Sequence, residues 1–443
     1  MELRDLIVTP IIIILIYVIA YMVRARFADD VTRRYFIPAL TVKLLGAIAL
    51  GLLYQFYYDG GDTFVYHTHG SRVIWDAFVK SPSLGLKLLF SDGNLAPGMW
   101  ESSEKIWHFY DQKSFFIIRI ATIFDLLTFS SYSATAALFA TLSFIGGWMM
   151  FLTFYKKYPE IHKALAYSCL FVPSIIFWGS GILKDTVTLA FLGIATYCID
   201  RLFIERKPHL GFLILLIFSF YVIFSVKIYI LMSFLIAAMF WIFSGSFFKI
   251  RSTILKLMLV PVIISFCLYV SYLGVKKLVE DDPLYSLERL AETVRVTAYD
   301  IRYWTGKNAG SGYTLGDLDG SINGILKLAP SAVNVSLFRP YLWEVRNPLM
   351  LFSAIESLLT LLFTLYVIRK TNFDFFKNLS SPETIFCLTF ALIFAFGVGV
   401  STYNFGTLAR YKIPLLPYYF VSMVLILYHS KTKTDEEAEV IEP

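Results

Sequence analysis

An acidic stretch with two histidines, DGGDTFVYHTHGSR at residues 59–72, directly follows a long apolar run. Its two aspartates, Asp59 and Asp62, lie where the chain is expected to leave a membrane. A carboxylate in that place can act as a general base, because partial burial tunes its pKa. In a helix that begins at Asp62, Tyr66 and His69 follow at i+4 and i+7 on the same face. We therefore predict catalytic carboxylates at Asp59 and Asp62 and substrate contacts at Tyr66 and His69.

Two other interpretations of this stretch stay open. In the first, DGGD is a polar turn and Asp62 is the N-cap of the helix that follows. In the second, the histidines bind a metal, but His67 and His69 point in different directions on a helix, so HTH does not form a two-residue clamp. We predict no cofactor, since the residues do not indicate a divalent metal.

A second polar group lies in PSIIFWGSGILKDTVTL, residues 173–189. Lys184 and Asp185 fall between two expected membrane spans, at the outer boundary. A lysine beside a helix N-terminus favours a phosphate, because the unpaired N–H groups and the helix dipole both attract an anion. Alternatively, Asp185 caps the helix and Lys184 extends its ammonium group to water. We predict both residues to bind substrate.

A third polar group lies in STYNFGTLARYKIPLLP, residues 401–417. Arg410 and Lys412 are placed on the outer side, where basic residues are less expected. A planar guanidinium at the lipid boundary suits a phosphate or diphosphate head group. The alternative is a snorkelling arginine paired with an acidic loop residue. Both residues are predicted to bind substrate.

A long loop carries five further arginines and two stacking aromatics, Trp304 and Trp343. The arginines are Arg289, Arg295, Arg302, Arg339 and Arg346. Such a loop suits anionic saccharides or lipid phosphates, whereas the simpler explanation for most of these residues is the solvated face of an amphipathic helix. Arg339, in FRPYLWE, is the exception because it lies close to the return into the membrane, and we predict it as a substrate contact.

The elements that must position these residues are membrane helices. The chain has 443 residues, of which 57% are hydrophobic, 17% aromatic and only 16% charged, with a mean hydropathy of +0.65. This balance excludes a soluble globular protein, and several apolar runs reach the roughly 20 residues that a membrane helix needs. The fold class expected is an all-α polytopic membrane protein with about 11 transmembrane helices. The expected spans are 6–23, 38–57, 133–155, 162–181, 186–203, 209–225, 228–247, 252–274, 349–368, 384–403 and 412–428.

Basic clusters follow the odd-numbered spans, which predicts that those ends are cytoplasmic. The N-terminus is then outside and the C-terminus inside. Residues 1–430 are expected to form one transmembrane domain with outer loops at 59–132 and 275–348, and residues 431–443 a disordered cytoplasmic tail. In the first loop, SFFIIRIATIFDLLTF contains Arg119 and Asp125 and is predicted as an interfacial or half-inserted helix.

All four cysteines, Cys169, Cys198, Cys267 and Cys387, fall inside apolar runs without metal-ligand spacing. They are predicted to be buried thiols without disulfides. The net charge of +6 is expected of cytoplasmic loops and does not indicate nucleic acid. The chain has no GxGxxG or P-loop motif, which argues against a nucleotide-sugar donor.

Carboxylates and cations at one lipid boundary fit the transfer of a group from a lipid-linked phosphate. A carboxylate orients or deprotonates an acceptor hydroxyl, and the cations stabilise the charge that develops on the leaving phosphate. Three ionisable residues in or near spans, Lys43, Lys227 and Glu356, indicate a different class, a transporter or flippase of lipid-linked or anionic solutes. The polar groups gather at one membrane face and no paired halves are visible, which favours an enzyme over a carrier. A non-catalytic membrane scaffold is a third alternative.

A membrane exit followed by an acidic motif and an outer loop of interfacial helices resembles the GT-C superfamily of polyprenyl-phosphate-dependent glycosyltransferases. This resemblance implies a catalytic carboxylate at Asp59 or Asp62, and GTLARYKIPLLP is similar to the Arg-Tyr-x-x-Pro-x-x-Pro ending of mannosyltransferase-like members. The segments GGDTFVY and SGILKDTVTLAF also resemble Wzy-type and EPS-type polysaccharide polymerases, which carry a basic residue at the place of Lys184. The acidic loop follows the second span here rather than the first. Either an N-terminal helix has been added, or the GT-C likeness is superficial.

The sequence therefore predicts a glycosyltransferase that acts at the outer face of a bacterial cytoplasmic membrane. Its expected partners are membrane lipid, a sugar linked to polyprenyl phosphate, and a saccharide or protein acceptor, without nucleic acid. The nearest alternative is a polymerase that joins lipid-linked oligosaccharide repeats.

Overall fold

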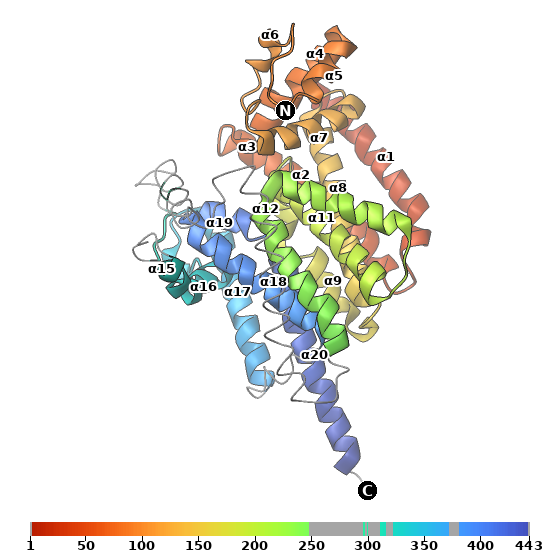
Figure 1. The fold of residues 1–443 in the computed structure, drawn as a ribbon, viewed down its shortest axis with the longest axis vertical. Helices are drawn as coiled ribbons and strands as arrows, with labels where there is room; N and C mark the ends of the chain where they lie inside the picture. The colour runs from red at the N-terminus through yellow and green to blue at the C-terminus, as the bar shows by residue number, and fades with distance from the viewer. Residues whose placement is uncertain are drawn as a thin grey trace. The chain divides into compact units, whose positions relative to one another are not determined.

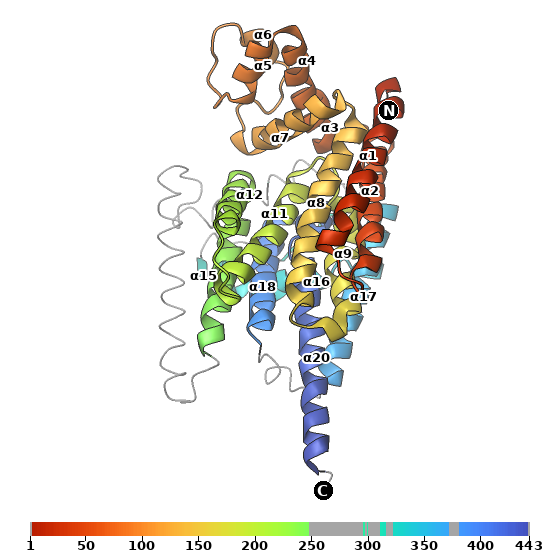
Figure 2. The same ribbon diagram turned by 90° about the vertical axis from the view of Figure 1, so that its right-hand side faces the viewer.

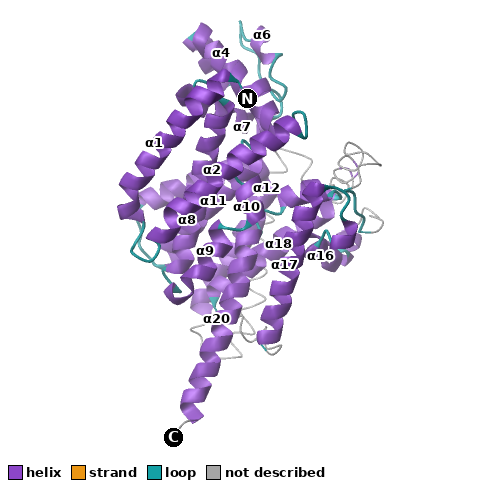
Figure 3. Ribbon diagram, turned by 180° about the vertical axis from the view of Figure 1, so that it is seen from behind, coloured by secondary structure: helices purple, strands orange, loops and turns teal. Residues whose placement is uncertain are grey.

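The structure of the protein is a computed structural model that describes residues 2–247, 296, 299, 311–315, 322–371 and 381–441. It divides into two compact units, unit 1 (Met1–Ile228) and unit 2 (Tyr229–Pro443). The described residues form helices and loops without a β-strand, and the only bridge among them joins Gly312 to Asn404 (Figure 3). The expected all-α fold of a multi-pass membrane protein is confirmed.

Seven helices in the described residues are long and apolar enough to cross a membrane, and a bent pair makes up to eight. The expected span 252–274 lies outside the described residues. The number of about 11 spans and the orientation of the chain stay predictions.

Four long helices form the body of unit 1, and two short helices connect the third and the fourth (Figure 1). The long helices are α1 (Leu3–Phe27), α2 (Arg33–Phe56), α8 (Tyr132–Tyr155) and α11 (Lys184–Ile199), and the short ones are α9 (His162–Leu170) and α10 (Pro173–Trp178). The expected span 162–181 is thus interrupted. Val172 is extended (φ −68°, ψ 126°) because the ring of the following proline disfavours helical backbone in the residue before it.

The helices α8 and α11 approach each other closely through small residues. A Cβ atom built on Gly146 would lie 2.1 Å from the carbonyl oxygen of Ala190, and one built on Gly193 would lie 2.1 Å from the carbonyl oxygen of Gly146. Membrane helices often associate in this way, because lipid supplies little hydrophobic driving force and close backbone contact replaces it.

A set of short helices covers one end of unit 1, the end at which α1 begins (Figure 2). They are α3 (Asp62–Tyr66), the π-helical turn η1 (His67–Ser71), α4 (Arg72–Lys80), α5 (Pro82–Leu89), α6 (Trp100–Ser103) and α7 (Gln112–Thr128). We call this the α3–α7 end. The helix predicted as interfacial is α7, which is not among the membrane-spanning candidates.

After α11 the chain continues through the π-helical turn η3 (Asp200–Ile204) into α12 (Leu210–Phe247). The expected spans 209–225 and 228–247 both fall in α12, which is broken at Lys227 by an extended backbone (φ −148°, ψ 86°). The two expected spans are therefore joined by one non-helical residue, Lys227, rather than by a longer turn.

Unit 2 is built on three long helices and several short ones. They are α15 (Ile322–Lys327), α16 (Ala329–Phe338), the 3-10 turn η5 (Leu342–Glu344), α17 (Pro348–Lys370), α18 (Pro382–Thr402), α19 (Phe405–Tyr411) and α20 (Leu416–Ile441). Aromatic rings of Phe390 and Tyr418, 4.5 Å apart, join α18 to α20. The axes of α19 and α20 differ by 67°, and this bent pair has the length and composition of one broken span or of a re-entrant loop. The helix α20 continues through most of the expected tail 431–443.

We expect Gly146→Ala to lower the free energy of unfolding by about 1–3 kcal/mol, because the added methyl group overpacks the contact between α8 and α11. Unfolding of the protein in detergent, followed by circular dichroism, measures this change. The matched control is Gly397→Ala, since nothing lies within 4 Å of a Cβ atom at that position of α18. Equal stability of the two variants would contradict the close approach.

Candidate functional site

The acidic motif begins in a left-handed turn. Asp59, Gly60 and Gly61 have φ values of 51°, 123° and 113°, a conformation that glycine adopts without steric cost. Asp59 is exposed on this turn. Asp62 is half-buried and is the first residue of α3, whose N-cap is Gly61 without a side-chain hydrogen bond. Asp62 is therefore not the N-cap residue that one interpretation of the sequence made it.

The regular helix assumed for the spacing of Asp62, Tyr66 and His69 ends at Tyr66. The chain then forms the π-helical turn, in which the backbone of His69 is non-helical (φ −99°, ψ 18°). The ring of His69 stacks on Trp107 at 4.2 Å, and Tyr66 is buried beside the ring of His108 at 6.0 Å. Their expected role as substrate contacts stays a prediction, but the helical spacing no longer supports it.

His67 belongs to an interior polar group rather than to the exposed face. Its ring is fully buried, and Nε2 lies 3.5 Å from Oδ1 of Asp125, which is also fully buried. The carboxylate of Asp125 accepts hydrogen bonds from Ser71 Oγ at 2.7 Å and Thr135 Oγ1 at 2.5 Å. These bonds tie the π-helical turn to α7 and α8. Within the described ranges no group of three or more His, Cys, Asp or Glu side chains is placed to hold a metal.

The chemically most varied cluster of unit 1 surrounds the N-terminus of α11. We call it the α11 cluster and define it as Asp62, Asp111, Lys184, Asp185 and Lys227. Nζ of Lys184 lies 3.8 Å from Oδ2 of Asp111, and the charges of Asp62, Asp185 and Lys227 also act on it. The N-cap residue of α11, Leu183, offers no side-chain acceptor to the first N–H groups of the helix. The cluster thus combines carboxylates, ammonium groups and a positive helix end.

Asp111 belongs to the α11 cluster but was not among the site residues predicted from the sequence. It is the N-cap of α7, where its carboxylate accepts from the N–H of Lys113 at 3.1 Å and from the hydroxyl of Ser114. Burial raises the pKa of Asp111, but the bond from Ser114 and the charge of Lys184 outweigh it, so the pKa lies below the ordinary 3.8. Its stabilising contribution is therefore present above that value and is lost as the pH falls through the folded pKa. The signal in the sequence was an aspartate before the apolar run of α7.

Lys227 and Asp185 form a buried ion pair in the same cluster. Nζ of Lys227 contacts Oδ1 of Asp185, whose side chain is fully buried, while that of Lys227 is 8% exposed. Asp185 is the second residue of α11 and does not cap it, contrary to one interpretation of the sequence. The pair attaches the break of α12 to the start of α11.

Lys43, the other lysine expected inside a span, makes hydrogen bonds that stabilise the fold. Its buried ammonium group donates to Ser143 Oγ at 2.9 Å and to the carbonyl oxygens of Ile175 and Gly179 at 2.8 and 2.9 Å. Those carbonyls lie at the C-terminal end of α10, where no full helical turn follows to donate N–H groups, and the carbonyl oxygen of Ile175 also accepts from the N–H of Gly179 at 3.2 Å. A cation suits a helix C-terminus for the same reason.

Two of the predicted substrate contacts of unit 2 meet at one serine. Ser357 Oγ of α17 donates to the carbonyl oxygen of Arg339 at 2.9 Å and receives the ammonium group of Lys412 at 3.1 Å. The guanidinium of Arg339 pairs with Glu344, and Lys412 is buried beside the charge of Glu356. We call these residues the α17 cluster. Arg339 and Ser357 are 18 residues apart in the sequence, and no sequence pattern predicted their contact.

Arg410 is half-buried near the end of α19, with its guanidinium 5.3 Å from the ring of Tyr411. Of the other loop arginines, Arg346 is described and exposed. Arg289, Arg295, Arg302 and Trp304 lie outside the described residues, as does Cys267. The three described cysteines, Cys169, Cys198 and Cys387, are buried free thiols as predicted.

Comparisons with the models of protein families, with curated proteins and with solved structures find no match to this chain. The function is therefore argued from the two clusters themselves.

We expect Asp185→Asn to destabilise the protein by about 3–5 kcal/mol, because it leaves the buried ammonium group of Lys227 without its charge partner. Denaturant unfolding in detergent measures the loss. The double variant Asp185→Leu/Lys227→Met removes both charges and is expected to recover most of the stability. If the double variant is less stable than the single one, the pair does not act as a unit.

Proposed function

We propose that this protein is an integral membrane glycosyltransferase that takes its sugar from a polyprenyl-phosphate-linked donor at the α3–α7 end. The observation that carries the proposal is the α11 cluster, in which Lys184 lies within 3.8 Å of one carboxylate and under the influence of two others. The resemblance to the GT-C superfamily supports the same reaction class.

The roles follow from the chemistry of the side chains. Asp62 is the proposed general base, because it is half-buried at the start of α3 and its charge acts on Lys184. It accepts the proton of the acceptor hydroxyl as the oxygen attacks the anomeric carbon and the bond from that carbon to the phosphate oxygen breaks. Lys184 and the positive end of α11 stabilise the charge that develops on the leaving phosphate.

Asp111 and Asp185 are proposed as positioning residues. Asp111 is held as the N-cap of α7, and its pKa lies below the ordinary value, so it stays ionised at neutral pH and orients the ammonium group of Lys184. Asp185 is occupied by Lys227 and fixes the start of α11. Asp59, exposed on its glycine turn, is the second candidate base, and the experiment below separates the two.

In unit 2, considered by itself, Lys412 and Arg339 of the α17 cluster and Arg410 of α19 are proposed as cations that bind an anionic phosphate. The orientation predicted from the basic loops supports the proposal that the α3–α7 end is the outer end in a bacterial cytoplasmic membrane. The same chemistry serves a polymerase of lipid-linked repeats, which differs only in its acceptor. A transporter has less support in the described residues, since Lys43 and Lys227 are both engaged in structural contacts.

We expect Asp62→Asn to lower the rate of sugar transfer by about 10²–10⁴-fold, the range for loss of a general base. Lys184→Met is expected to lower it by roughly 10²–10³-fold through loss of charge stabilisation. The assay uses the protein in liposomes with radiolabelled polyprenyl-phosphate sugars and separates product from donor by chromatography. A lengthening saccharide product identifies the polymerase.

The matched control is Asp76→Asn, which changes an exposed aspartate of α4 at the same end of the unit. It is expected to transfer at the wild-type rate. If Asp59→Asn is inactive and Asp62→Asn is active, the base is Asp59. If the wild-type protein transfers no sugar from any lipid-linked donor, or if Asp59→Asn, Asp62→Asn and Lys184→Met are all as active as wild type, the proposed function is wrong.

A further inference from the structure

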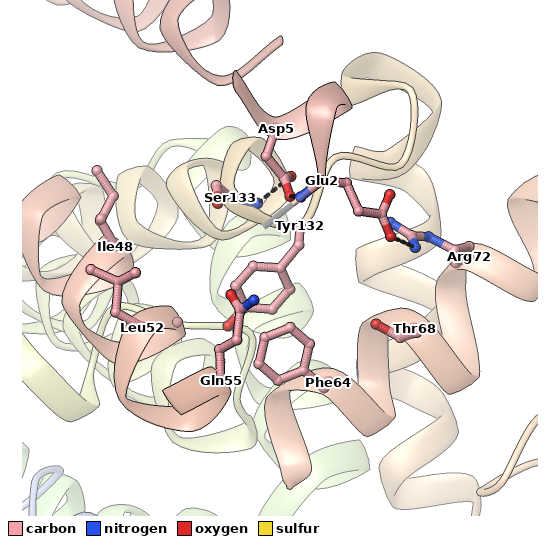
Figure 4. Close-up of a pocket in the computed structure, with 11 residues that line it drawn as sticks. Glu2, Asp5, Ile48, Leu52, Gln55, Phe64, Thr68, Arg72, Tyr132 and Ser133 are labelled. Atoms are coloured by element: carbon pink, nitrogen blue, oxygen red, sulfur yellow. Dashed lines mark hydrogen bonds and ion pairs between the residues drawn. The ribbon is translucent and has the colours of Figure 1, made fainter. Parts of the chain in front are cut away.

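We propose that a cavity between the first turns of α1 and the last turns of α2 binds a primary ammonium group, as carried by the head group of an aminophospholipid. This site is separate from the α11 cluster and is independent of the proposed reaction. The cavity measures about 50 Å³ and is closed on one side by the ring of Tyr132 from α8 (Figure 4).

The walls of the cavity are polar on three sides. Asp5 lies at its upper edge beside Glu2, Gln55 of α2 extends its amide toward Tyr132, and Thr68 faces the cavity from the π-helical turn (Figure 4). Tyr132 also receives the stacked ring of Phe64 at 4.4 Å, which fixes its position. These groups offer carboxylate, amide and hydroxyl oxygens, the acceptors that an ammonium group with three N–H donors requires.

The charge of the cavity indicates a cation. Asp5 is 5% exposed and accepts from Ser131 Oγ at 2.7 Å, from the N–H of Ser133 at 3.3 Å and from the N–H of Glu2 at 2.9 Å. No lysine or arginine in the described part of the chain pairs with it, although a buried carboxylate without a counter-charge is costly. Arg72 pairs with Glu2, so two carboxylates and one guanidinium leave a net charge of −1.

The volume selects a small ligand. A bound water needs about 10–15 Å³ of the same measure, so the cavity has room for a group of a few heavy atoms. A trimethylammonium group has three methyl groups and cannot donate to the carboxylates, and it prefers a cage of aromatic faces. The lining therefore favours the primary ammonium of ethanolamine over the quaternary ammonium of choline.

The position of the cavity connects it to the lipid. Ile48 and Leu52 of α2 complete its wall, and Leu52 is 37% exposed on a helix whose last residue, Phe56, is 75% exposed. Such exposed apolar side chains on a membrane helix face acyl chains, so the end of α2 lies at the level of the head groups. Arg72, at the opposite edge, is placed for the phosphate of the same lipid (Figure 4).

The test measures which lipid the protein retains. The full-length protein is reconstituted in liposomes of equal amounts of phosphatidylethanolamine, phosphatidylcholine and phosphatidylglycerol, extracted gently, and analysed by native mass spectrometry. We expect phosphatidylethanolamine to be retained about tenfold over phosphatidylcholine, as charge-assisted hydrogen bonds in a partly buried site imply. Glu2→Gln, which removes one carboxylate charge, and Leu52→Trp, which fills the cavity and leaves both carboxylates in place, are expected to abolish this preference.

Glu104→Gln, at an exposed position of the same end, is the matched control and is expected to retain the wild-type preference. Free ethanolamine at millimolar concentration separates two sources of the ammonium group. If it displaces the lipid, the site also accepts soluble amines, and if it does not, the site needs the whole head group. The proposal is overturned if wild type retains the two zwitterionic lipids equally, or if Glu2→Gln and Asp5→Asn both keep the preference. Thermal unfolding of each variant shows that it is folded.

Discussion

A chain that breaks its helices in an apolar environment must find partners for the carbonyl and N–H groups that each break leaves free. In the part of the chain that the structure describes, three such breaks carry a lysine. Lys43 donates to the last carbonyls of α10, Lys227 forms the break of α12, and Lys412 lies between α19 and α20. The ammonium group of each is itself satisfied, by carbonyl oxygens, by Asp185 or by Ser357.

These lysines explain why the fold can hold irregular backbone next to its proposed reaction site. The break before α11 brings the N-terminus of that helix to the α3–α7 end, and the pair of Lys227 with Asp185 fixes its direction. The close contact of α8 with α11, made by Gly146 and Gly193, then holds the helix against its neighbour. The N–H groups and Lys184 at the start of α11 are thus supported by a rigid helix rather than by a loop, which is what precise charge stabilisation needs.

The same end of unit 1 separates two kinds of carboxylate. Asp125 and Asp5 are buried and receive several hydrogen bonds; Asp125 connects the π-helical turn and α7 to α8, and Asp5 connects α1 to the start of α8. Asp62 and Asp111 are less buried and lie with Lys184. Residues of one chemical type therefore serve structure or chemistry according to burial and to the charges around them.

The sequence by itself determined the helical class, the membrane location and most of the long helices, because a long apolar run has few alternatives to a membrane helix. The sequence also predicted Asp62, Lys184 and Lys412 as site residues, because charged side chains are unusual at a lipid boundary. Only the tertiary structure decided that His67 is buried, that the regular helix ends at Tyr66, and that Asp111 meets Lys184. These facts depend on a π-helical turn and on contacts between segments 73 residues apart, and the local pattern of side chains does not encode such contacts.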